Sequence, residues 1–89
     1  MHAVVVRVSI SDTEAATRFL HERIVPGVSQ APGFVTGHWV QWDDGSKGAA
    51  MMIFESEDAA NQAKEMIQPP PDDSATIERV EVGEVVANA

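Results

Sequence analysis

Cysteine is missing from all 89 residues of this sequence. Its absence excludes disulfide bridges, thiolate nucleophiles, iron–sulfur clusters and the usual cysteine-based zinc sites. A chain without cysteine suits a reducing compartment, and we therefore expect a cytoplasmic protein.

Positive charge is scarce, and so are long apolar runs. Six Lys and Arg stand against 14 Asp and Glu, which gives a net charge of −8. A molecule of that charge repels phosphate backbones and anionic lipids, so we expect neither nucleic acid nor a membrane as a partner.

The longest apolar run, residues 49–54, is far too short to span a bilayer, and the N-terminal residues lack the pattern of a signal peptide. We expect a soluble protein that is not exported.

The composition, with 44% hydrophobic residues, is that of a globular protein, and we predict a single domain over residues 1–89. A domain of this size buries only roughly 60 to 65% of the surface that its unfolded chain exposes. An oligomer that covers more apolar surface is therefore expected.

A β-hairpin is predicted at the centre of the chain. The apolar runs FVTGHWVQW and AAMMIF flank the polar turn DDGSKG, whose Asp-Gly pair is a strong hairpin signal. A two-residue loop at this Asp-Gly pair would place Trp39 opposite Ala50 and Val35 opposite Phe54, on the helix-covered side of the sheet. His38 would then face the other way, whereas a loop longer by one residue would reverse the assignment.

The first strand is predicted over residues 2–10, which are rich in β-branched side chains. Its even positions make a wholly apolar face, while its odd positions are mixed and carry Arg7. We expect both faces to be covered, which implies a layer beyond the helices.

Two helices are predicted from capping signals and apolar spacing. Ser11 and Glu14 form a capping box at the start of the first, and Pro26 should kink or end that helix near residues 24–25. Ser56 caps the second helix, and three prolines stop it. The expected buried stripes are Ala16, Phe19, Leu20 and Ile24, with Arg18, Glu22 and Arg23 mostly outside, and then Ala59, Ala63, Met66 and Ile67.

The last strand is predicted over residues 75–87, with a bulge or bend at Gly83 because the valines change parity there. The order strand, helix, strand, strand, helix, strand predicts a ferredoxin-like α+β fold. Its four-stranded antiparallel sheet would carry both helices on one face.

Three short passages extend this interpretation: APGF at 31–34, FESED at 54–58 and ERVEVGEVV at 78–86. In these passages the chain resembles the dimeric α/β-barrel superfamily, and within it the antibiotic-biosynthesis-monooxygenase-like and related uncharacterised members. The resemblance implies a homodimer in which the helix-free faces of two sheets pack together to form a barrel. The faces that would meet include Val5, Arg7, Met51 and Ile53.

No cofactor is expected. Haem-degrading members of the superfamily use an Asn, a Trp and a His at positions that match Val6, Phe54 and approximately Lys64 here, so none of the three side chains fits. The cofactor-independent, quinone-forming members hold a phenolic substrate with Asn, Trp and Tyr side chains. This chain has no Tyr, and its only Asn residues are Asn61 and Asn88.

Two classes of function remain open. The resemblance implies a cofactor-independent monooxygenase-like enzyme that acts on a small aromatic or polyketide-like compound. The alternative is a non-catalytic dimer that binds small molecules or is associated with stress. An apolar pocket with two or more converging polar groups would favour the enzyme, and a sealed core would favour the alternative.

His38 is the candidate catalytic residue, because it is the one titratable side chain in the aromatic run from 34 to 42. Candidate substrate-binding residues are Trp39, Trp42, Arg7 and His21. The tryptophans would hold a flat hydrophobic or aromatic ligand, and Arg7 would pair with a carboxylate or phenolate.

Each candidate also has a purely structural interpretation. Aromatic side chains on a central strand commonly pack in a core or an interface. Arg7 would then pair with a carboxylate such as Glu55 or Glu81, and His21 would lie at the edge of its helix's apolar stripe. The three histidines lack the spacing of a metal site, so no metal is expected.

Overall fold

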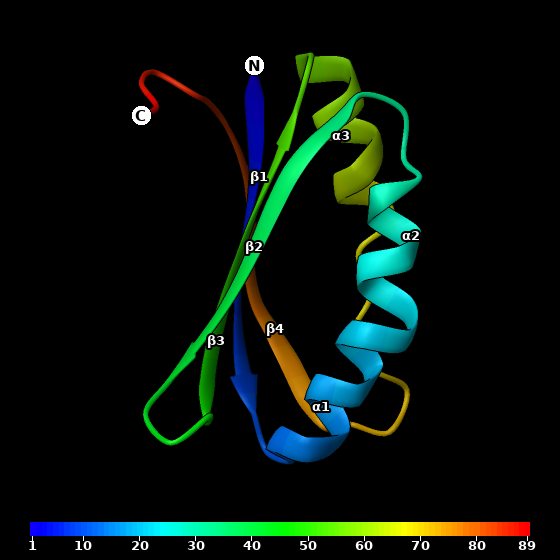
Figure 1. Ribbon diagram of the computed structural model, residues 1–89. Helices are drawn as coiled ribbons and strands as arrows, with labels where there is room; N and C mark the ends of the chain where they lie inside the picture. Colours follow the sequence, from blue (N-terminus) through cyan, green and yellow to red (C-terminus); the bar gives the residue numbers. More distant parts are fainter.

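The computed structural model describes residues 1–89, and its strands form one antiparallel sheet in the order β2-β3-β1-β4. Both helical segments lie on the same face of this sheet (Figure 1). This is the predicted ferredoxin-like α+β arrangement. The elements are β1 (His2–Ile10), α1 (Thr13–Phe19), η1 (Leu20–Ile24), α2 (Val25–Ser29), β2 (Phe34–Trp42), β3 (Lys47–Phe54), α3 (Glu57–Glu65) and β4 (Ala75–Glu84).

The central hairpin has the predicted register. Asp44 and Gly45 take positive φ angles of 55° and 83°, as both central residues of a type I′ turn must. Trp39 pairs with Ala50 and therefore faces the helices, which confirms the prediction. The alternation along β2 places His38 on the helix-free face.

The register of β2 shifts at its start, where the prediction for Val35 is wrong. Phe34, and not Val35, pairs with Phe54, because one extra residue is inserted between Phe34 and Thr36. The two rings meet edge to face with centroids 5.7 Å apart. The bulge leaves Val35 43% exposed and directs the larger apolar side chain into the core.

The buried core lies between the sheet and α3. Its members are Val4, Val6, Ala50, Met52, Phe54, Ala60 and Ala63. The even positions of β1 thus face the helices as predicted. On the odd positions, Ala3 is buried, Val5 is half-buried and Arg7 is exposed within a single chain.

Helix α3 begins at the predicted cap, where the Oγ atom of Ser56 accepts a hydrogen bond from the N–H of Ala59 at 3.1 Å. Its buried stripe differs from the prediction in two places. Ala60 is fully buried while Ala59 is half-buried. Met66 is 64% exposed, because the helix ends at Glu65 and the apolar spacing no longer applies beyond it.

The first helix is capped by Asp12 and not by Ser11. The Oδ1 atom of Asp12 accepts from the N–H of Ala15 at 3.1 Å. The Ser11 hydroxyl instead donates to the carbonyl of Asp73 at 2.9 Å, which ties the start of the helix to the linker before β4. In that linker, hydrogen bonding from Ser74 holds the pKa of the Asp72 carboxyl below its ordinary value.

Pro26 is predicted to kink or end the first helix near residues 24–25. The helix does not end there, because α1, η1 and α2 follow one another without a break (Figure 1). An irregularity does lie at the predicted place, where the π-helical turn η1 gives way to α2 between Ile24 and Val25. The N–H of Val25 donates to the carbonyl of Leu20, five residues back, so the helix widens by one residue before Pro26. This π-helical turn accommodates a proline that has no N–H to donate.

The irregularity in β4 lies five residues before Gly83, where it was predicted, and falls at Glu78. Gly83 pairs regularly with Ala3, and the register shift falls opposite Arg7 and Val8, where Glu78 is the inserted residue. The Ser9 hydroxyl donates to the carboxylate of this inserted Glu78. The predicted bulge at Gly83 is therefore wrong, because the valines after it lie beyond the end of the strand at Glu84.

Candidate functional site: an apolar cavity under the long helix

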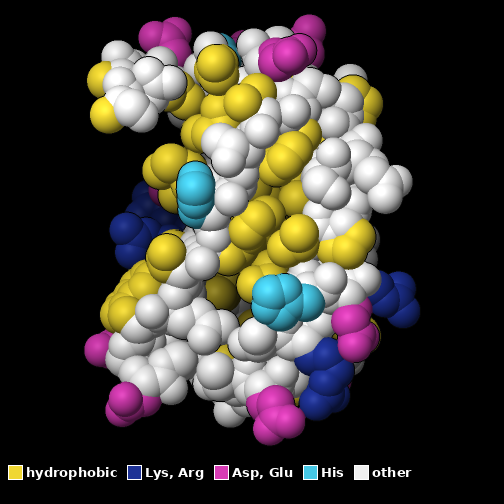
Figure 2. All heavy atoms as spheres, in the orientation of Figure 1, with side chains coloured by type: hydrophobic (Ala, Val, Ile, Leu, Met, Phe, Trp, Pro, Cys, Tyr) yellow, Lys and Arg dark blue, Asp and Glu magenta, His cyan; other side chains and the backbone are white.

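A cavity of about 710 Å³ opens between the long helix α1–η1–α2 and the sheet. Hydrophobic residues make up 20 of the 29 that line it. Figure 2 shows hydrophobic side chains gathered in a hollow of the surface over this region. A cavity of this size falls within the range of roughly 300 to 1,000 Å³ that is usual for small-molecule sites.

The cavity exists because the long helix spans the sheet without packing closely on it. None of its residues is buried, whereas α3 buries two alanines against the same sheet. The helix is held near its ends, where the Thr13 hydroxyl donates to the Gly45 carbonyl at 3.1 Å and the N–H of Phe34 donates to the Ala31 carbonyl at 3.2 Å.

Small residues on the sheet form the floor of the cavity. Gly48 and Ala50 belong to β3, which lies between β2 and β1, and both residues line the cavity. A Cβ atom at Gly48 would lie 3.0 Å from Val8 Cγ2, so a larger residue would crowd the strand beside it. Small side chains below a helix that stands off leave the volume unfilled.

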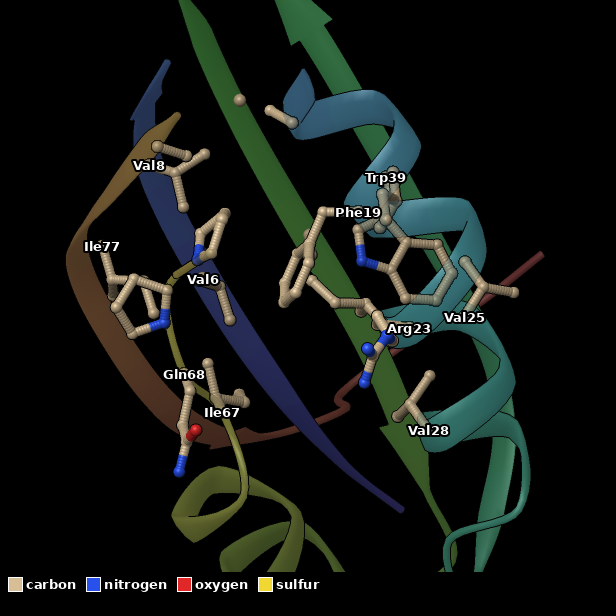
Figure 3. Close-up of a pocket in the computed structure, with 18 of the residues that line it drawn as sticks. Val6, Val8, Phe19, Arg23, Val25, Val28, Trp39, Ile67, Gln68 and Ile77 are labelled. Atoms are coloured by element: carbon tan, nitrogen blue, oxygen red, sulfur yellow. The ribbon is translucent and has the colours of Figure 1, made fainter. Parts of the chain in front are cut away.

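Trp39 forms one wall. Its indole folds back over Gly37, since a Cβ atom at Gly37 would lie 2.8 Å from Trp39 Cη2. Figure 3 shows the indole beside the long helix, close to Phe19 and Val25. An aromatic wall in an apolar cavity suits a flat organic ligand.

The polar groups around the cavity are few. Gln41 Nε2 donates to the hydroxyl of Thr17 at 3.1 Å, which links β2 to α1. His21 and Arg23, both exposed, are the only titratable residues in the lining. The amide of Gln68 approaches from the linker after α3 (Figure 3). Of these groups, the imidazole of His21 is the one whose ring nitrogens can both donate and accept a proton.

The residues predicted as a site from the sequence are divided between two faces. Trp39 and His21 line the cavity. His38, Trp42 and Arg7 are exposed on the helix-free face, with His38 opposite Met51. The structure therefore does not bring the candidate catalytic residue together with Trp39.

Arg7 lacks the ion pair expected for it. The structure contains three ion pairs, and none of them includes Arg7. Glu81 pairs instead with Arg79 at 2.9 Å, because alternate residues of β4 share one face of the sheet.

Sequence reasoning missed Arg23, Gln41 and Gln68. Arg23 follows Phe19 by four residues and therefore lies on the same side of the helix. Because its side chain is charged, the sequence predicts that it lies outside the apolar stripe. Gln41 follows Trp39 by two residues and therefore shares its side of β2. Gln68 lies in a linker, where no periodicity places a side chain.

The fold and the cavity define a small ferredoxin-like α+β protein with an open apolar cavity between helix and sheet. Comparison with protein-family models gives no match, and comparison with curated proteins gives none either. None of the helices has the length and apolar character needed to cross a membrane. No three residues with metal-binding side chains cluster together.

Proposed function

We propose that this protein binds a small aromatic or polyketide-like compound in the cavity under the long helix. The single observation that carries the proposal is the apolar, 710 Å³ cavity whose helical wall contributes no buried residue. Apolar side chains that line an open cavity remain in contact with water, and an apolar ligand that displaced this water would bury them and give them packing partners.

Ligand binding should raise the melting temperature strongly. A hydroxylated aromatic compound at about 100 times its dissociation constant should stabilise the fold by roughly 2.7 kcal/mol. For a domain of this size that corresponds to a rise of about 10 to 20 °C in a thermal-shift assay. Ala16→Phe should abolish the rise, because Ala16 lines the cavity and a phenyl group there would occupy it.

The matched control is Ala15→Phe, the same substitution one residue away at a position that does not line the cavity. It should leave the ligand-induced rise unchanged. A rise that survives Ala16→Phe, or a screen of such compounds that produces no rise in the wild-type protein, would contradict binding in this cavity.

A monooxygenase-like reaction is the second candidate. His21, Arg23 and Gln41 line the same apolar cavity, and polar groups in an apolar cavity favour a reaction there. Without a cofactor the substrate must be the reductant: a ring CH₂ group becomes a carbonyl with one atom of O₂, and the second oxygen atom leaves as water. Oxygen consumption that depends on the bound compound, measured with an oxygen electrode, would distinguish this enzyme from a simple binding protein.

We also propose that two copies associate through their helix-free faces. That face exposes large apolar side chains, with Val40 54%, Met51 48% and Trp42 40% exposed. Large apolar side chains exposed together on one face of a sheet often mark an interface, and a two-fold axis would bury the same side chains on both copies. The unpaired Arg7 on the same face would gain acidic neighbours from a second copy of so acidic a chain.

Met51→Lys should convert a dimer into a monomer, because Met51 lies in the middle of β3 and a lysine there would bury a charge without a partner. Sedimentation equilibrium at micromolar concentration measures the change. Met66→Lys is the matched control, since Met66 is 64% exposed at the end of α3, away from this face. A wild-type protein that sediments as a 9.6 kDa monomer would overturn the proposal.

A further inference from the structure

We infer that the ligand is an organic acid, with an apolar body inside the cavity and one anionic group bound by Arg23 at its mouth. The inference rests on the proposed function, because it requires that the cavity bind a ligand at all. It adds the charge of that ligand and the residue that recognises it.

The first argument is the distribution of charge. The chain carries 14 Asp and Glu, and not one of them lines the cavity. One of its six Lys and Arg does, and His21 is the only other titratable residue there. A cavity with basic and no acidic groups on an otherwise acidic molecule attracts anions locally and gives a cationic ligand no partner.

The second argument is that Arg23 has no partner within the chain. The three ion pairs join His2 to Glu57, Arg18 to Glu14 and Arg79 to Glu81. Arg18, on the same helix, thus has an acidic residue four positions away, while Arg23 has none in contact. The Arg23 guanidinium is therefore free to bind an anion from solution, and its planar shape suits a carboxylate or a sulfonate.

The third argument is the placement of the guanidinium. Arg23 lies on η1, four residues after Phe19 on the inner stripe of the helix. Figure 3 shows its side chain extending into the space between Val28 and Ile67. Because Arg23 is exposed, its head group reaches solvent at the mouth while the apolar lining lies behind it. This arrangement fits an amphiphile whose acid group stays at the surface, where the planar guanidinium can bind two oxygens at once.

A pair of fluorescent probes tests the inference. 1-Anilinonaphthalene-8-sulfonate and N-phenyl-1-naphthylamine have the same aromatic body, and only the first carries an anionic group. Arg23→Gln should weaken binding of the sulfonate about tenfold, equivalent to about 1.4 kcal/mol, and change binding of the neutral probe less than about twofold. Arg23→Lys keeps the charge and should restore part of the loss.

Arg18→Gln is the matched control, since it removes the same charge from the same helix outside the cavity. It should leave the affinity of both probes unchanged. Circular dichroism of each variant verifies that the fold is retained.

The two proposals fail in distinguishable ways. If Ala16→Phe blocks both probes and Arg23→Gln leaves the sulfonate as tightly bound as before, the cavity binds ligands and the inference about the acid is overturned. An equal loss of sulfonate affinity in Arg18→Gln and Arg23→Gln would also overturn it, because the effect would then come from net charge. If neither probe responds to Ala16→Phe, the cavity is not their site and the proposed function itself is contradicted.

Discussion

Phe54→Ala is expected to destabilise the protein by about 3 to 5 kcal/mol, the range found when a buried phenylalanine is truncated. Phe54 is 0% exposed, meets Phe34 edge to face at 5.7 Å and belongs to a core of only seven buried residues. A domain of this size has a total stability of about 4 to 13 kcal/mol. The variant should therefore unfold at a much lower urea concentration, measured by circular dichroism, or fail to fold at all.

Phe19→Ala compares the truncation of a residue that lines the cavity with the truncation of the core residue Phe54. Phe19 is half-buried, and its ring faces the cavity rather than a filled core. Its truncation removes fewer packing contacts and should cost less than half as much in the same urea titration. Equal losses in the two variants would show that the long helix packs as tightly as β3, and would contradict an open cavity.

Gly33→Ala is expected to cost about 2 to 3 kcal/mol. Gly33 has a φ of 79°, where a Cβ atom costs about 1 to 2 kcal/mol. The added methyl group would also lie 2.8 Å from the Cβ atom of Ala59, which forces α3 or the connection to move. The Gly33 carbonyl accepts from the N–H of Glu55 at 2.8 Å, so the connection that follows the long helix is fixed to the end of β3. The midpoint of urea unfolding measures the loss.

Gly27→Ala provides the control for Gly33→Ala. Gly27 lies inside α2, and a Cβ atom there would have no neighbour within 4 Å. The same substitution at this position should stabilise the protein by about 0.5 to 1 kcal/mol, because alanine loses less backbone entropy in a helix than glycine. A Gly33→Ala variant within 0.5 kcal/mol of the wild type would show that neither the backbone conformation nor the contact with α3 constrains this connection.

Local chemistry in the sequence determined the order of the elements and much of the sheet register. The Asp44-Gly45 pair specified the hairpin turn, and that turn placed Trp39 opposite Ala50 on the helix side. Ser56 capped α3 as expected, and the even positions of β1 entered the core. These features depend on residues that are neighbours in the chain or across one tight turn, so propensity and alternation suffice to predict them.

Only the tertiary structure decided the features that depend on distant segments. The Ser11 hydroxyl donates to a carbonyl of the linker before β4, and Asp12 caps the helix in its place. The bulge that brings Phe34 over Phe54 follows from contacts between strands, which no single segment encodes.

The cavity also depends on how distant segments pack together. The helix continues past Pro26 through a π-helical turn, and small residues on the sheet beneath it leave the volume open. The periodicity of a sequence predicts which face of a helix or strand a side chain lies on. It does not predict whether other side chains fill the space in front of that face. For that reason Trp39 could be assigned to its face from the sequence, whereas Arg23 at the mouth of a cavity could be recognised only once the helix and the sheet were placed together.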